Sequence, residues 1–181
     1  FETPDGASVT NASLQGKTVL LDFWQVDCAP CKAHTPELEK VYQQLKANDK
    51  FAFYAVSLDG KNRVSNEVAA RTLKNWGGTF PLLRDPDFTA KQLQVAGTPT
   101  LMLLGPDGRL QYFHIRQHRD PQQLASMIQK VLDGADLAAE ARAEHQLLLK
   151  KYESELTAAA ESGDLLQINV ARPEFGERAL P

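Results

Sequence analysis

The chain has 181 residues, 43% of them hydrophobic and 24% charged, a composition typical of a globular protein with one ordinary domain and an appendage. Its net charge of −3 argues against nucleic acid as a main partner. The longest dense apolar stretch, residues 18–24, is interrupted by Asp22, so the sequence excludes a membrane span within the chain.

Strand and helix patterns alternate along the first half of the chain. The first 16 residues contain turn signals and can form a hairpin or a loosely attached strand. Beyond them, runs rich in β-branched and aromatic residues and apolar residues at helical spacing predict a strand, a helix that begins at the cysteines, a second strand and a second helix. We place the two strands at 18–24 and 51–58 and the second helix at 62–76 with Val64 on its apolar face.

The next segment adds a short helix, a hairpin and another helix. The short helix is predicted over 87–93, and the hairpin joins strands 100–104 and 110–114 through Gly105-Pro-Asp-Gly108. The helix over 121–132 starts with Asp120 as its N-cap. Helical crossovers imply parallel strands and the hairpin adds antiparallel ones, so we expect an α/β sandwich with a mixed sheet.

The composition changes after residue 134. Residues 1–134 carry a net charge of +1, whereas residues 135–181 hold nine acidic and five basic side chains. An apolar stripe from Leu137 predicts a long helix that ends near Gly163, followed by a short strand over 165–170 and an irregular end. We therefore divide the chain into a domain, 1–134, and a helical C-terminal extension, 135–181, which either packs on the domain or binds a partner.

The two cysteines of the chain, Cys28 and Cys31, form one C-x-x-C motif at the start of a predicted helix. One helical turn brings the two sulfurs within disulfide reach. The positive end of the helix favours a thiolate at the first cysteine. Cys28 is therefore the candidate attacking sulfur and Cys31 the candidate resolving sulfur. Pro30 between them does little harm at a helix start.

Metal binding is the main alternative for this motif. A zinc site needs four ligands, and the chain has only two cysteines. His114 and His118 have a zinc-like spacing, but they follow the cysteines by about 80 residues and lie beside arginines. We therefore expect neither a metal nor another cofactor besides the redox-active disulfide.

Several motifs together resemble the thioredoxin superfamily over roughly residues 1–134. They are Leu20-Leu-Asp-Phe-Trp24, Cys28-Ala-Pro-Cys31-Lys32 and Gly97-Thr-Pro-Thr100. The long segment between the cysteines and Pro99, with its extra helix, resembles the TlpA/ResA branch of extracytoplasmic thioredoxin-like proteins. The resemblance implies a thioredoxin-like three-layer α/β/α sandwich.

The resemblance also implies roles for individual residues. Pro99 is expected to be a cis-proline facing the disulfide, with the Thr98 backbone pairing to an extended client segment. Asp22 matches the buried acid that helps to remove the proton from Cys31, and a carboxylate in an apolar strand should have a raised pKa. An ordinary edge-strand charge is its alternative. Further candidate client contacts, which complete the expected site, are Trp24, Ala29 and Pro30; Trp24 can equally belong to the core.

Two positions depart from the family pattern. Asp27 stands where an aromatic residue often precedes the first cysteine, and its charge should oppose thiolate formation and make the docking face more acidic. His34 replaces the usual glutamate three residues after the second cysteine. A histidine there is expected to titrate near neutrality and to make the reactivity depend on pH.

The expected function is reduction of disulfides in extracytoplasmic client proteins, with electrons from a membrane-linked or soluble thiol donor. The chain starts at Phe1, so we expect that a signal or anchor segment preceded it. Alternatives are an oxidase or isomerase of the same fold, or a non-catalytic binding module. Self-association through residues 135–160 is a further expectation.

Overall fold

The computed structural model describes residues 1–118 and 120–162. The expected strand over 165–170 and the irregular end lie outside the described residues. The central sheet contains five strands in the order β3-β2-β1-β4-β5. They are β1 (Thr18–Trp24), β2 (Phe51–Ser57), β3 (Leu82–Arg84), β4 (Thr100–Leu104) and β5 (Leu110–Ile115).

The sheet is mixed, as the alternation of helices and the hairpin predict. β1 pairs in parallel with β2, and β2 in parallel with β3. β4 runs antiparallel to both β1 and β5. β1 is therefore central, and all seven of its residues are buried. A strand buried on both faces reads as a continuous apolar run, which is why residues 18–24 are so easily recognised.

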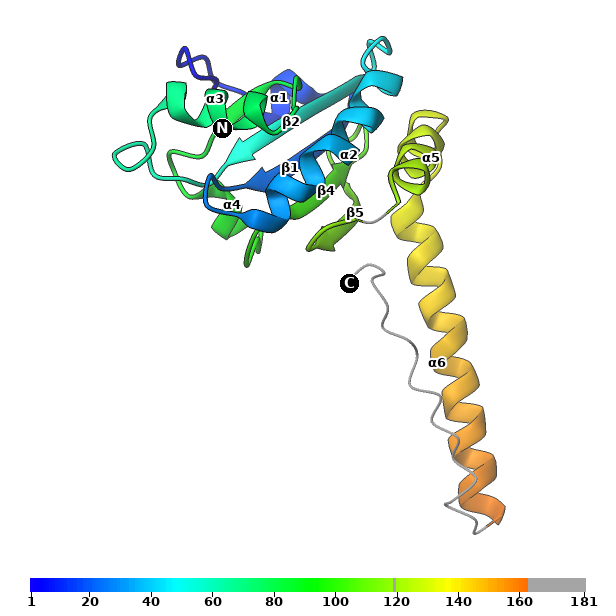
Figure 1. The fold of residues 1–181 in the computed structure, drawn as a ribbon. Helices are drawn as coiled ribbons and strands as arrows, with labels where there is room; N and C mark the ends of the chain where they lie inside the picture. The colour runs from blue at the N-terminus through cyan, green and yellow to red at the C-terminus, as the bar shows by residue number, and fades with distance from the viewer. Residues whose placement is uncertain (119, 163–181) are drawn as a thin grey trace.

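Helices cover both faces of this sheet (Figure 1). One core cluster joins Leu20 and Trp24 of β1 to apolar residues of α2 (Ala29–Leu45), α3 (Asn66–Asn75) and α5 (Pro121–Leu132). A second cluster joins Val19, Leu21 and Phe23 to α4 (Thr89–Gln92), with Leu14 of α1 (Asn11–Leu14) packed against it. The result is the expected α/β/α sandwich.

The structure differs from the expectation at the start of α3 and in the additional strand β3. α3 begins at Asn66 rather than at residue 62, because the Ser65 side chain accepts a hydrogen bond from the Val68 N–H and caps the helix there. Val64 thus lies in the preceding turn, although it is buried. β3 has only three residues and follows Pro81, so it gave no period-2 pattern from which to predict it.

The N-terminal segment attaches to the edge of β3. Glu2 forms isolated bridges with Ser8 and with Arg84, and the backbone N–H groups of Glu2 and Arg84 each donate to the other residue's carbonyl. The expected loosely attached strand is therefore reduced to a bridge that extends the sheet beyond β3.

The expected long helix is present as α6 (Leu137–Ser162), which projects from the sandwich beyond α5 (Figure 1). Leu137 at its start packs partly against the core, whereas Leu147 is 69% exposed. No helix in the described part of the chain is long and apolar enough to span a membrane. The division of the chain at residue 134 stays a prediction.

Candidate active site

The two cysteines form a disulfide at the N-terminus of α2, with their Cα atoms 5.2 Å apart. Cys28 is the N-cap of the helix, and its sulfur accepts a hydrogen bond from the Cys31 N–H at 3.1 Å. Cys28 is half-buried, whereas Cys31 is only 2% exposed. The more accessible sulfur thus lies where the helix dipole stabilises negative charge most strongly.

Ala29 and Pro30 separate the two cysteines and are both exposed. They occupy the first turn of α2, where backbone N–H groups have no partner within the helix. Proline therefore removes no helical hydrogen bond there. An exposed pair beside the half-buried Cys28 is positioned to contact a molecule that approaches this sulfur.

Asp22 lies in the middle of β1 and is 3% exposed. Because side chains alternate along a strand, Asp22 faces the same side as Leu20 and Trp24, which pack in the cluster that contains Cys31. Burial raises the pKa of Asp22 to about 7, as the sequence led us to expect. The edge-strand alternative is wrong because β1 is the central strand.

The Thr98–Pro99 peptide bond is cis, the isomer that the resemblance implies. The pairing of Phe23 with Thr100 puts this bond beside the loop that follows β1. The Thr98 hydroxyl approaches the Gln25 side-chain oxygen at 3.4 Å. The Pro99 carbonyl accepts the Arg116 N–H at 2.8 Å, so the hairpin already occupies this acceptor.

Trp24 requires a correction. It is 1% exposed and packs edge-on against Trp76, with ring centroids 5.3 Å apart. A side chain so completely enclosed cannot contact a client in this form of the protein. Trp24 therefore belongs to the core beneath the site, the other of the two roles that its sequence position allows.

The charge of Asp27 is balanced within the structure. Its carboxylate forms an ion pair with Arg63, and both side chains are about two-thirds exposed. This pairing was not foreseen, because Arg63 lies 36 residues further along the chain. The docking face therefore does not gain the uncompensated acidic charge that the sequence led us to expect.

The expectation that His34 titrates near neutrality is wrong. His34 is 1% exposed on the inner face of α2, and burial lowers its pKa to about 4, with further contributions from His118 and His114. The rings of His114 and His118 lie 5.3 Å apart and are also buried. The three histidines are thus core residues that join α2 to the end of β5.

The histidines have no complete metal-ligand arrangement around them. Among residues 1–118 and 120–162, no group of three or more histidine, cysteine, aspartate or glutamate side chains is arranged to hold a metal ion. His114 stacks on Tyr112 with their rings nearly parallel, and His118 packs edge-on against Tyr112. Both histidines thus contribute to an aromatic cluster with Tyr112.

The sequence analysis does not identify two buried charged residues near the site, Asp59 and Arg84. Asp59, 5% exposed, accepts the Val26 N–H through its carboxylate at 3.0 Å. Arg84, 0% exposed, donates to the Asp59 backbone carbonyl at 2.8 Å. The position of Asp59 directly after a predicted buried strand is a sequence signal for a functional or structural carboxylate. For Arg84, the only sequence signal is that the residues before it are apolar.

The chain is similar to known proteins over the part that holds this site. A family model described as thioredoxin-like matches residues 16–110, more than half of the chain. The chain therefore belongs to the thioredoxin-like family.

Individual relatives carry related names. The thiol-disulfide oxidoreductase ResA of Oceanobacillus iheyensis is 32% identical over 111 residues, which are 61% of this chain and 55% of the relative. The chain thus spans about half the length of this curated relative. A solved structure from Chlorobium tepidum, described as a candidate thiol:disulfide interchange protein DsbE, is 28% identical with a TM-score of 0.62 and covers 72% of this chain and 90% of its own.

A second solved structure is that of a secreted Mycobacterium tuberculosis disulfide oxidoreductase homologous to Escherichia coli DsbE. It is 25% identical, with a TM-score of 0.57, and covers 70% of this chain and 91% of its own. Both solved structures leave out more than a quarter of this chain, so the similarity supports a thioredoxin-like fold for most of the chain rather than for all of it.

Proposed function

We propose that the chain is a thiol–disulfide oxidoreductase that reduces disulfides in client proteins. The observation that carries this proposal is the Cys28–Cys31 disulfide at the N-terminus of α2, with the more accessible sulfur as the N-cap. A redox-active pair needs one sulfur that a partner can reach and a second sulfur within bonding distance of the first. The site meets both requirements.

Reduction of a client begins from the dithiol form. The Cys28 thiolate attacks one sulfur of the client disulfide, a mixed disulfide forms, and the other client sulfur leaves as a thiolate that takes up a proton. The helix N-terminus favours the thiolate of Cys28. Exposed Ala29 and Pro30 and the backbone of Thr98 are the client contacts that we assign to this step.

Release of the client requires Cys31. Asp22 accepts the Cys31 proton, and the resulting Cys31 thiolate attacks the Cys28 sulfur. The client sulfur leaves as a thiolate and takes up a proton, so the client is released as a dithiol. The Cys28–Cys31 pair is thereby oxidised from the dithiol to the disulfide. A carboxyl group with a pKa of about 7 can take up and release this proton near neutral pH. The cis-proline Pro99 lies beside the loop that follows β1, and we assign it to contact the mixed disulfide from the side of this protein.

An extracytoplasmic location and a thiol electron donor, membrane-linked or soluble, complete the proposal. The similar Mycobacterium tuberculosis oxidoreductase is a secreted protein, which supports a location outside the cytoplasm for this chain. There, an external thiol must return two electrons to the Cys28–Cys31 disulfide after each turnover.

Two cysteine variants test the mechanism with insulin as the disulfide substrate and dithiothreitol as the donor. We expect Cys28→Ser to abolish the acceleration of insulin reduction. Pre-reduced Cys31→Ser, mixed with insulin in the absence of dithiothreitol, should accumulate a covalent mixed disulfide that added dithiothreitol then releases. Turnover by Cys28→Ser at the wild-type rate, or capture of insulin through Cys31 rather than Cys28, contradicts the proposal.

We also propose that α6 mediates self-association. Leu147, Leu148 and Leu149 are between 41% and 69% exposed, an unusual concentration of apolar surface on one helix. Lys151 forms an ion pair with Glu155 of the same helix, with the charged atoms 3.7 Å apart, so part of the charge beside these leucines is compensated within α6 itself.

A further inference from the structure

The loop between β2 and α3, residues 58–65, forms hydrogen bonds with residues 24–26, which precede the cysteines in the sequence. The Leu58 N–H donates to the Trp24 carbonyl at 3.0 Å, which is the last backbone bond between the two strands. One residue further on, the backbone pairing is replaced by a side chain: the Asp59 carboxylate accepts the Val26 N–H at 3.0 Å. Val26 lies two residues before Cys28.

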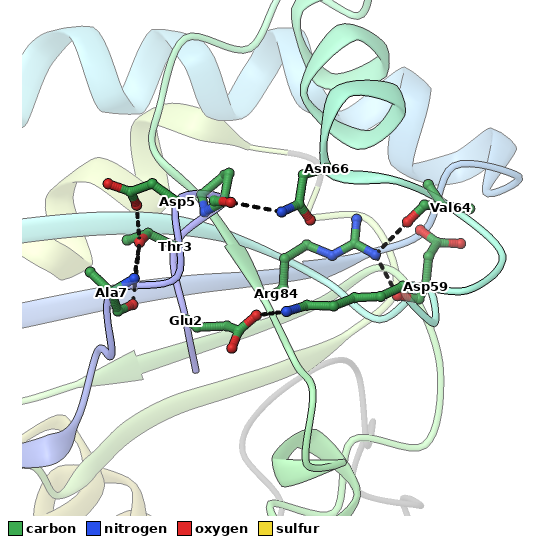
Figure 2. A network of polar contacts seen from close by, with 10 residues as sticks. Glu2, Thr3, Asp5, Ala7, Asp59, Val64, Asn66 and Arg84 are labelled. Atoms are coloured by element: carbon green, nitrogen blue, oxygen red, sulfur yellow. Dashed lines mark hydrogen bonds and ion pairs between the residues drawn. The ribbon is translucent and has the colours of Figure 1, made fainter.

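Asp59 is itself fixed on several sides. The Ser57 hydroxyl donates to the same carboxylate oxygen at 3.1 Å, and Ser57 is completely buried. The Arg84 guanidinium donates through one nitrogen to the backbone carbonyls of Asp59 and Val64, each at 2.8 Å (Figure 2). Because Arg84 belongs to β3, these two hydrogen bonds connect the loop to the sheet near its start, at Asp59, and near its end, at Val64.

The position of Cys28 depends on this arrangement. Its sulfur caps α2 through the Cys31 N–H, and its backbone N–H donates to the Gln25 carbonyl at 3.2 Å. A half-buried N–H deprived of its acceptor costs free energy, so without the Asp59 carboxylate the segment 25–27 would move to satisfy the Val26 N–H elsewhere. Such a movement shifts the Cys28 sulfur relative to the helix N-terminus.

We propose that Asp59 is a positioning residue: by accepting the Val26 N–H it fixes the segment before Cys28 and holds the Cys28 sulfur at the N-terminus of α2. This inference deepens the proposed function and rests on it, since it takes Cys28 to be the reacting sulfur. Asp59 acts through Val26 and does not contact the client.

The test measures the rate of Cys28 alkylation by iodoacetamide against pH, in the full chain with the background variant Cys31→Ser. Asp59→Asn and Asp59→Ala both remove the carboxylate charge, but only asparagine keeps an acceptor oxygen for the Val26 N–H. We expect the midpoint pH to be higher in Asp59→Ala than in Asp59→Asn, toward the ordinary thiol value of about 8.5. Alkylation of Asp59→Ala at pH 7 should be slower by roughly threefold to tenfold.

Asp120 provides a matched control, because its carboxylate also accepts backbone N–H groups, those of Gln122 and Gln123, but at the start of α5. Asp120→Ala should lower the melting temperature and leave the alkylation midpoint unchanged. Equal midpoints and rates in Asp59→Asn and Asp59→Ala, or an equal shift in Asp120→Ala, would overturn the inference.

A further variant serves if Asp59→Ala does not fold. Asp59→Glu keeps the charge and moves the oxygen by one methylene, so its midpoint should also rise; a wild-type midpoint in this variant overturns the inference. Alkylation needs no client. An inactive wild-type protein with the expected midpoints therefore contradicts the proposed function alone, whereas an active protein with equal midpoints contradicts only the role of Asp59.

Discussion

Asp22 combines a stability cost with a proposed role in catalysis. Burial raises its pKa from 3.8 to about 7, so its contribution to stability is fully present below about pH 3.8 and is lost as the pH rises toward 7. Asp22→Asn removes the ionisable group. At pH 8 this variant should be more stable than the wild type, by about 4 kcal/mol at most.

The same substitution should slow the release of clients, because Cys31 loses its proton acceptor. Urea unfolding at pH 5 and pH 8 measures the stability, and single-turnover reduction of insulin measures the release. A variant whose stability gain is the same at both pH values, with unchanged release, would remove Asp22 from the mechanism.

His34 should make the fold sensitive to acid. Its pKa is lowered from 6.5 to about 4, so the neutral imidazole is the form that the fold accommodates. Stability is retained above about pH 6.5 and is lost as the pH falls toward 4, by about 3 kcal/mol at most. His34→Gln should reduce this loss, as measured by urea unfolding at pH 7 and pH 4.5.

The exposed His145 on α6 supplies the control for this prediction. His145→Gln should lose as much stability in acid as the wild type. An equal acid sensitivity in all three proteins would mean that His34 is not the group responsible.

For single residues, the sequence identifies those whose role follows from their immediate neighbours in the chain. The cysteine pair and its position on a helix follow from spacing, and the raised pKa of Asp22 follows from its apolar neighbours. Trp24 and His34 could not be assigned in this way, because their environments are created by Trp76 and by β5, which come from distant parts of the chain.

Side chains that accept backbone N–H groups determine where the helices around the site begin. The Asp120 carboxylate accepts two N–H groups at the start of α5, and the Cys28 sulfur accepts one, that of Cys31, at the start of α2. Asp120→Ala should therefore lower the free energy of unfolding by about 1 kcal/mol. The measurement is urea unfolding at pH 7, and insulin reduction should stay at the wild-type rate. A loss of activity without a loss of stability would contradict a purely structural role for this cap.

The sequence predicts the long elements and the short helix α4, which lies within the expected range 87–93, but it does not predict the short strand β3. A single sequence displays β1 and β2 as runs rich in apolar, β-branched and aromatic residues, α2 and α5 as apolar residues at helical spacing, and the hairpin through its turn residues. β3 was missed because its three residues are defined by pairing with β2. The start of α3 was placed four residues too early, because the buried Val64 mimics a helical position while it lies in a turn.

At the level of the whole molecule, the exposed leucines of α6 predict concentration-dependent association. Leu147→Glu puts a charge in the centre of this surface and should shift the protein toward the monomer. Gln146→Glu adds the same charge at the neighbouring exposed position and is the matched control. Sedimentation over a hundredfold range of concentration measures the effect. A monomeric wild type, or equal effects of the two variants, contradicts self-association through α6.

The sequence predicted a sheet-based part followed by a long helix, since the composition changes close to where α6 begins. It did not reveal that Arg84, Asp59 and Val26 form one connected support for the cysteines. Arg84 ends β3, whereas Asp59 and Val26 lie in the loops after β2 and β1, and only folding brings these three segments together.

The proposed reductase function depends most directly on the equilibrium redox potential of the Cys28–Cys31 pair, measured against a glutathione or dithiothreitol series. Each 30 mV corresponds to about 1.4 kcal/mol for this two-electron couple. We predict a single two-electron transition with a midpoint below about −230 mV, on the reducing side of the oxidising disulfide enzymes. A midpoint at or above about −180 mV, where protein disulfide isomerase operates, would contradict the assignment as a reductase.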